Sequence, residues 1–458
     1  MRVFPPPLEI GDDEGFDPAK DIFRRADFGH SLLALVSNVE DPLVILLDSP
    51  WGTGKTTFIK MWAGEARKAG HPVVYFDAFA NDHQENAFLA LAGEVIGASR
   101  RAKAARTSAY RKFLGRATKA GKVMLRAGTK IGIKAATLGV LDATDIDTIK
   151  NVAGDLADAA ASSADDFVSR LLQEQAKSME TMSSFRTALS DLGVTLSDKT
   201  NEDGNSKSLV FIVDELDRCR PSFALDVIEN IKHLFSVPNV HFILVAYAGQ
   251  LENSIKYRHG PDIDSMLYLQ KFYNVIVHLP EGGIYRSERV IHKYLSHLRA
   301  NLAFIGDSKE RDQMFDQLEG LAEAKGYSLR TVERIATLLN LCLAVTPANH
   351  LKLLPIVPGL VAMKLTAPNL FARAKRGTLA ASEAFKFLDF AHWPTDGAYR
   401  TEWMQKWWTY CLENELPGEA AEWHGFAGDL SYRYNIDDRG RIVPLMATTV
   451  VDRVGAPG

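Results

Sequence analysis

The residues from Ser49 to Thr57 are of the types that bind phosphate. Glycines let backbone N–H groups curl around a phosphate, a lysine places a positive charge on its outer oxygens, and a threonine hydroxyl can bind Mg²⁺. The segment fits the Walker A pattern at its second glycine, its lysine and its threonine, while Ser49 stands where the first glycine normally lies. The pattern predicts a nucleotide-binding loop formed by Trp51, Gly52, Thr53, Gly54, Lys55, Thr56 and Thr57.

Two carboxylates after a later apolar segment could complete the chemistry. Leu209 to Val213 is continuously apolar and is followed by Asp214 and Glu215, which is the Walker B form. We expect Asp214 and the Thr56 hydroxyl to hold Mg²⁺, and Glu215 to orient or deprotonate the attacking water, with Lys55 as a second catalytic residue. Because no Asn-Lys-x-Asp string that would read guanine follows the fourth expected strand, we predict ATP rather than GTP.

These motifs need a scaffold that brings them to one place, and the apolar pattern supplies one. Continuous apolar segments of strand length, typical of strands buried on both faces of a parallel sheet, occur at 43–48, 72–76, 209–213, 240–246 and 275–279. Helical patterning fills the intervals. The alternation predicts a doubly wound α/β domain of the P-loop NTPase type, which binds its ligands at the carboxyl ends of the strands.

The strand pattern is interrupted once and then stops. From about residue 100 to 205 the sequence is helical and rich in alanine, and after about 285 it is helical again, most clearly at 288–302, 308–325 and 330–345. We therefore expect a P-loop domain in two parts, separated by a helical insertion and followed by a helical C-terminal region. The expected boundaries are 1–99, 100–205, 206–284 and 285–458.

Composition limits the classes of protein to which the chain can belong. It has 458 residues, 46% of them hydrophobic, and 53 basic against 57 acidic side chains give a net charge of −4, so bulk attraction to nucleic acid is excluded. Cys219, Cys342 and Cys411 lie far apart without metal-ligand spacing, which argues against disulfides or zinc. Neither a secretory signal nor a transmembrane segment is expected, and a cytoplasmic location fits best.

Several strings beyond the two motifs resemble the KAP family of P-loop ATPases, which has eukaryotic membrane-associated and bacterial phage-exclusion members. The resemblance covers roughly residues 17–345. It implies the AAA-like branch of P-loop enzymes, in which an extra strand separates the two Walker strands and a helical region after the sheet touches the nucleotide. The strings that carry it are Trp51 before Gly52, Tyr75 to Phe79, Asp214 to Cys219, and Tyr268 to Phe272.

The same resemblance suggests further site residues. Arg330 is similar to the family's sensor arginine at the start of a helix, which makes it a catalytic candidate, although Leu329 replaces the usual proline. Arg334, one helical turn later, is a second candidate. The family's aspartate after the fourth strand is absent here, and Tyr247 or Gln250 could position water in its place.

The insertion carries an unusual concentration of positive charge. No acidic residue lies between Glu94 and Asp142, and Lys112 to Lys134 recur every three or four positions, which predicts a cationic amphipathic helix. Three interpretations remain open for residues 100–134: a solvated face of a structural hairpin, contact with nucleic acid, or contact with an anionic membrane surface. The basic residues are Arg100, Arg101, Lys103, Arg106, Arg111, Lys112, Arg116, Lys119, Lys122, Arg126, Lys130 and Lys134.

Together these patterns predict an ATPase that uses ATP with Mg²⁺ to change the relation between the P-loop domain and its helical regions. A homo-oligomer or a complex with a protein partner is expected, and the family resemblance suggests bacterial phage defence as the setting. The alternative is a slowly hydrolysing, nucleotide-gated switch that recruits a partner effector, nucleic acid or a membrane surface.

Overall fold

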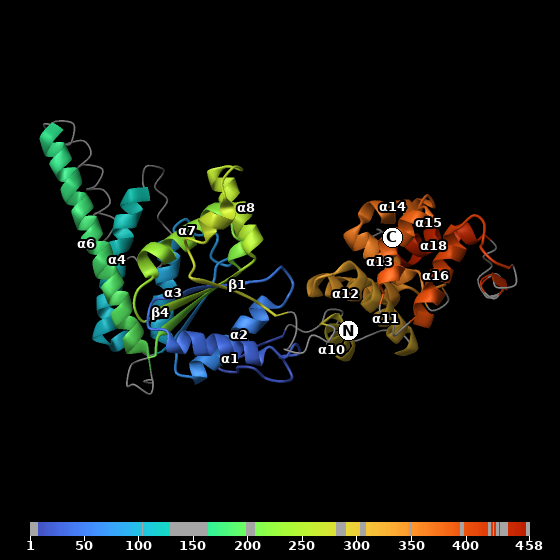
Figure 1. Cartoon of the computed structure of the whole chain (residues 1–458), viewed down its shortest axis with the longest axis horizontal. Coiled ribbons are helices and arrows are strands. Elements are labelled where there is room, and N and C mark those ends of the chain that lie inside the picture. Colours follow the sequence, from blue (N-terminus) through green and yellow to red (C-terminus); the bar gives the residue numbers. More distant parts are fainter. Residues whose placement is uncertain are drawn as a thin grey trace.

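A computed structural model gives the fold of the chain. The residues that the structure describes are 8–102, 104–128, 164–197, 207–280, 290–302, 308–347, 350–393, 398–419, 423–424, 426, 430 and 438–454. Figure 1 shows two lobes: an N-terminal lobe, residues 8–280, built around a sheet, and a helical C-terminal lobe, residues 290–454.

The sheet of the N-terminal lobe has five strands in the order β2-β3-β4-β1-β5, and every neighbouring pair is parallel. The strands are β1 (Val44–Asp48), β2 (Val73–Asp77), β3 (Leu209–Asp214), β4 (Val240–Ala246) and β5 (Val275–His278). Strand β4 lies between β1 and β3, so one strand separates the two Walker strands, as the resemblance implied. Because all strands are parallel, the loops after β1 and β3 emerge at the same edge.

Both faces of this sheet are buried, which explains the continuous apolar segments. In β3, Phe211 and Val213 face one core while Val210 and Ile212 face the other, as expected for a period of two. Helices α1 (Ala26–Asn38) and α2 (Lys55–Lys68) cover the second face. The first face is covered by α3 (Ala87–Arg101), α7 (Pro221–Asn230) and α8 (Ala248–His259). The doubly wound P-loop fold is confirmed.

Helices also fill the interval between β2 and β3, where the insertion was expected. After α3 come a short 3₁₀ helix (Ala104–Arg106), α4 (Ser108–Gly128) and α6 (Ala164–Leu196). Helices α4 and α6 run side by side at the end of the N-terminal lobe that is farther from the C-terminal lobe (Figure 1). The predicted basic helix is present as far as Gly128, and Lys130 and Lys134 lie outside the described residues.

The C-terminal lobe has a hydrophobic core of its own. Trp393 and Trp408 are buried in it, and their indole N–H groups donate to the carbonyl oxygens of Leu388 and Pro355. Within the described part of the chain, no helix is both long and apolar enough to span a bilayer. The main helices of the lobe are α10 (Val290–Asn301), α11 (Ser308–Lys325), α12 (Leu329–Val345), α13 (Val357–Thr366), α14 (Pro368–Arg376), α15 (Ala381–Leu388), α16 (Ala398–Leu412) and α18 (Ile442–Met446).

Candidate functional site

The loop between β1 and α2 has the conformation of a phosphate-binding loop. Gly52 and Gly54 have φ values of 79° and 89°, which residues with a Cβ rarely adopt. Ser49 is not among the residues with positive φ, and its hydroxyl donates to Thr53 Oγ1 at 2.8 Å. A glycine is therefore not required at this position, because the serine side chain closes the loop instead. The free N–H groups of the first turn of α2 favour an anion directly after the loop.

Lys55, the first residue of α2, is buried with 9% of its surface exposed. Its ammonium group donates to the carbonyl oxygens of Ser49 and Pro50 and lies 3.8 Å from a carboxylate oxygen of Asp217. Burial lowers the pKa of Lys55, and the negative charge of Asp217 opposes that shift. Phosphate oxygens could replace the two carbonyl oxygens, so the lysine is placed to bind a phosphate group.

Asp214 ends β3 with only 1% of its surface exposed. Tyr75 of the neighbouring strand donates its hydroxyl hydrogen to Asp214 Oδ2 at 2.6 Å, and the N–H of Glu215 donates to Oδ1 at 2.8 Å. Burial raises the pKa of Asp214, and the hydrogen bond from Tyr75 opposes that shift. These contacts hold the carboxylate in one orientation beside the start of α2.

Glu215 adopts a left-handed backbone conformation with φ 59°, which is uncommon for a residue other than glycine. Its Oε1 accepts a hydrogen bond from Thr56 Oγ1 at 3.4 Å, and its Oε2 accepts one from Arg218 at 2.5 Å. Burial raises the pKa of Glu215, and Arg218 lowers it. The backbone turn therefore brings the second Walker B carboxylate to the Walker A threonine.

The oxygen atoms of Thr56, Asp214 and Glu215 are hard ligands of the kind that Mg²⁺ prefers. Among the described residues, no group of three or more histidine, cysteine or acidic side chains could hold a metal ion by itself. An ion bound by these oxygens would take phosphate oxygens and water as its remaining ligands.

The sequence left the role of Asp217 open, and the structure places it at the centre of the site. The carboxylate is 5% exposed, and its Oδ2 accepts hydrogen bonds from the Trp51 indole at 2.7 Å and from the Tyr247 N–H at 2.9 Å. Asp217 thus connects the loop after β1, the loop after β3 and the end of β4. These contacts could not be read from the sequence, because they join residues 30 and 166 positions apart.

We expect Asp217→Asn to lower the stability of the protein. The change removes a buried charge that two donors and Lys55 share, and weakening such a contact costs about 1–3 kcal/mol. Thermal unfolding with and without nucleotide would measure the loss. The matched control is Asp226→Asn, because Asp226 forms an exposed ion pair with Arg258 at 2.6 Å, which is worth at most about 1 kcal/mol. Equal losses in the two variants would contradict the central role of Asp217.

Arg25 is a site residue for which the sequence carried no signal. It lies before α1, it is 4% exposed, and its guanidinium donates to the carbonyl oxygens of Thr53 and Pro280, both at 2.9 Å. It therefore ties the phosphate-binding loop to the segment that follows β5. No local motif surrounds Arg25, and only the tertiary structure reveals these contacts.

A cavity of about 490 Å³ lies over the phosphate-binding loop and is closed on one side by the C-terminal lobe. All seven predicted nucleotide-binding residues line it, together with Asp214, Glu215 and Arg330. Its size falls within the range of small-molecule sites, about 300–1,000 Å³. Its apolar lining residues from the two lobes include Ile22, Phe23, Met61, Tyr294, Leu298 and Leu329.

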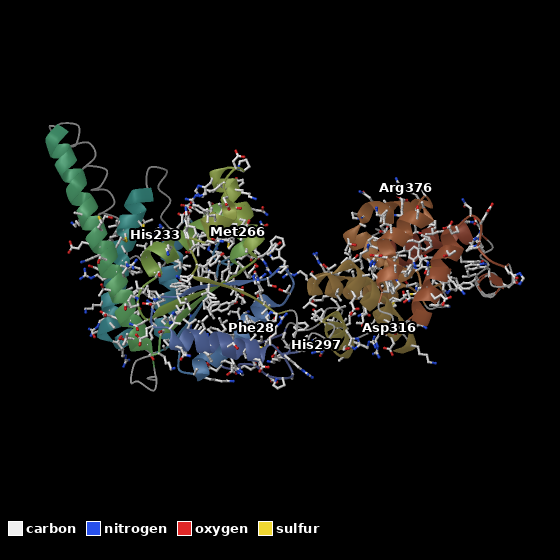
Figure 2. The ribbon with its side chains drawn as sticks, in the orientation of Figure 1. Phe28, His233, Met266, His297, Asp316 and Arg376 are labelled. Atoms are coloured by element: carbon white, nitrogen blue, oxygen red, sulfur yellow. The ribbon has the colours of Figure 1, made fainter. Side chains whose placement is uncertain are left out.

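The start of α12 lies directly against the loop. A Cβ added to Gly52 would meet Ser328 Oγ at 2.9 Å and Arg330 Cβ at 3.1 Å. Ser328 caps the helix by accepting the Thr331 N–H at 3.2 Å, which fixes where Arg330 emerges. His297 of α10 also lines the cavity and lies between the lobes in Figure 2.

The remaining sensor candidates are placed differently. Arg334, Tyr247 and Gln250 are not among the described residues that line the cavity. Tyr247 packs edge-on against Trp51, with 6.3 Å between ring centroids, and so supports the loop from outside. The structure thus brings Arg330 to the predicted nucleotide site and leaves the other three side chains outside its lining.

Comparison with known proteins gives one family match. The model described as the KAP family P-loop domain matches residues 25–345. No curated protein is similar enough to count as a relative. Among solved structures, the ADP form of the Aeropyrum pernix ORC2 protein is similar at 13% identity and a TM-score of 0.37, covering 94% of this chain and 88% of its own. The ADPNP-ADP complexes of the same protein give 14% identity, a TM-score of 0.32 and the same coverage.

Proposed function

Because the chain belongs to the KAP family of P-loop proteins and shares its nucleotide-binding P-loop, we propose that it binds ATP with Mg²⁺ and hydrolyses it. The observation that carries the proposal is the convergence of Lys55, Thr56, Asp214 and Glu215 on one cavity. These side chains come from two loops about 160 residues apart, as the 159-residue separation of Thr56 and Glu215 shows.

Each side chain has a separate task in this proposal. The loop N–H groups and Lys55 bind the β- and γ-phosphates, and Glu215 orients the attacking water and accepts its proton. Thr56 and Asp214 would hold Mg²⁺, which neutralises charge on the phosphates when bound. Arg330 approaches the same cavity from the C-terminal lobe and would stabilise charge that develops on the γ-phosphate.

The apolar lining residues Phe23 and Tyr294 mark the proposed place for the adenine base. The rings of Phe23 and Tyr294 lie 6.5 Å apart, one from each lobe. Tyr294 donates its hydroxyl hydrogen to Glu333 at 2.6 Å, which fixes the ring. A base bound here would contact both lobes, so binding and release of nucleotide would change how the lobes are held together.

The contact between Glu215 and Arg218 favours a second candidate function. At 2.5 Å the arginine holds the carboxylate that would orient water, and the residue after β4 is Tyr247 where the family tends to have aspartate. A slowly hydrolysing switch, which binds ATP and signals by conformation, fits this arrangement. For both candidate functions we propose a cytoplasmic protein that forms a homo-oligomer or binds a protein partner. Bacterial phage defence is the setting that the family suggests.

Phosphate release measured with ATP and with GTP, each with Mg²⁺ and with EDTA, tests the proposal. We expect turnover that requires Mg²⁺ and prefers ATP. Tight ATP binding without measurable release would favour the switch, and equal use of GTP would contradict the assignment of ATP.

We expect Arg330→Ala to reduce ATP turnover far more than Arg334→Ala. Both arginines are exposed and lie one turn apart on α12, but only Arg330 lines the cavity. Removing one group that stabilises developing charge costs about a hundredfold in kcat, while Arg334→Ala should change it little. Single-turnover rates at saturating ATP would measure the difference. Equal effects of the two substitutions would contradict the sensor role of Arg330.

A further inference from the structure

Helix α4 presents a row of basic side chains to solvent. Arg111, Lys112, Arg116 and Lys119 are all exposed, and we call them the cationic face of α4. At about 100° per residue they occupy an arc of roughly 140°. No aspartate or glutamate lies between Glu94 and Asp142 in the sequence, so α4 contributes no negative charge to this face.

The opposite side of α4 is covered by protein. Phe113 and Ala120 have no exposed surface, and Phe113 packs against Phe185 of α6 with 5.6 Å between ring centroids. Gly121 lies against α3 so closely that an added Cβ would meet Leu89 at 2.8 Å. A helix that lies in a membrane surface must bury its apolar side among lipid chains. Because that side of α4 is already buried in the N-terminal lobe, the cationic face can act only through its charge.

One carboxylate of α6 lies near this face. Lys112 lies 3.9 Å from Asp191 of α6, and both side chains are exposed, at 71% and 49%. Exposed pairs of this kind are worth at most about 1 kcal/mol. At the end of α3, Arg101 lies 3.8 Å from Glu94 and is 66% exposed. The pair with Asp191 therefore leaves the charge of Lys112 available for a partner.

The spacing of the basic side chains of α4 and the burial of its aromatic rings indicate which kind of partner it could bind. Lys112, Arg116 and Lys119 follow one another at intervals of four and three residues, about 6 and 4.5 Å along the helix axis, so one strand of closely spaced phosphates can contact several of them. Tyr110 and Phe113 are buried, at 5% and 0% exposed, so neither offers a ring on which an unpaired base could stack. Backbone contact without base readout is the remaining mode.

We propose that the cationic face of α4 binds the phosphate backbone of duplex nucleic acid, independently of base sequence. Helix α4 lies at the end of the N-terminal lobe that is farther from the C-terminal lobe (Figure 1). It is thus separate from the nucleotide cavity, and its substitution should leave ATP binding unchanged.

The test is fluorescence anisotropy of a labelled mixed-sequence DNA duplex of about 20 base pairs, titrated with the full chain at several salt concentrations. The test variant is Arg111→Glu/Arg116→Glu/Lys119→Glu. The control, Arg376→Glu/Lys386→Glu/Lys406→Glu, makes the same change in net charge at exposed positions of the C-terminal lobe, where Figure 2 labels Arg376. ATP affinity and thermal unfolding, measured for both, show whether each is folded.

We expect the wild type and the control to bind the duplex with steep salt dependence. The test variant should bind at least tenfold more weakly, and the slope of log affinity against log salt should fall by about 3, because each lost phosphate contact removes about 0.9. Single Arg116→Gln and Lys119→Gln variants should each lower that slope by about 1. Absence of wild-type binding at 50 mM salt, or equal loss in test and control variants, would overturn the proposal. Binding to phosphatidylserine vesicles without binding to the duplex would do the same.

Discussion

Replacing Glu215 with glutamine is expected to abolish ATP turnover while leaving ATP binding close to wild type. Glutamine keeps the size of the side chain and can still accept the Thr56 hydroxyl, but it cannot take a proton from water. Loss of a positioned general base costs about 10²–10⁴-fold in rate. Phosphate release and ATP affinity measured on the same preparation would show the two effects separately. Glu180→Gln, at an exposed position on α6, is the matched control.

The pH dependence of turnover gives a second measurement of the same group. Glu215 must be ionised to act as a base, so turnover should fall as the pH drops toward its pKa, which burial raises. Arg218 lowers that pKa, and Arg218→Ala should therefore move the acid limb of the kcat profile to higher pH. An unchanged acid limb in Arg218→Ala, or measurable turnover by Glu215→Gln near the wild-type rate, would exclude Glu215 as the base.

Lys55→Ala is expected to weaken ATP binding and to stop turnover. A hydrogen bond to a charged group contributes about 1.5–3 kcal/mol, which corresponds to a roughly tenfold to hundredfold change in affinity. Titration calorimetry with ATP and Mg²⁺ would measure it. Lys68→Ala, in the last turn of the same helix and 49% exposed, should bind ATP as the wild type does.

The buried position of Asp217 predicts how a second substitution changes the ATP affinity of Lys55→Ala. Once Lys55 is removed, the Asp217 carboxylate stays buried beside the phosphate-binding loop and repels phosphate. The double variant Lys55→Ala/Asp217→Asn should therefore bind ATP more tightly than Lys55→Ala alone. If the double variant binds more weakly, Asp217 acts mainly by holding Trp51 and the loop, and its charge matters little for nucleotide affinity.

The structure places the nucleotide cavity and the basic helix α4 in different parts of the molecule. The nucleotide cavity lies at the carboxyl edge of the sheet and takes residues from both lobes, whereas the cationic face of α4 lies on the inserted helices. Because the apolar side of α4 packs on α3 and α6, contact with an anionic membrane surface would have to depend on the charge of α4 alone. The proposed duplex binding and the proposed ATP turnover can therefore be tested independently.

The sequence by itself determined the elements of the nucleotide site. The phosphate-binding loop and the Asp214-Glu215 pair are local motifs, since neighbouring residues supply the glycines, the lysine and the carboxylates. The five strands were also predictable, because strands buried on both faces must be continuously apolar, and the structure places them within one or two residues of the predicted positions. For the same local reason, the helices at 308–325 and 330–345 were predicted almost to the residue.

Only the tertiary structure decided which distant residues meet at that site. Arg25, Asp217 and Tyr294 reach it through contacts across tens to hundreds of residues, and no local pattern records such contacts. It likewise distinguished Arg330 from Arg334, because the Ser328 cap sets which side of α12 faces Gly52. A motif can be recognised because neighbouring residues supply its reactive groups. The orientation of a side chain and its contacts with distant residues depend instead on how helices and strands pack.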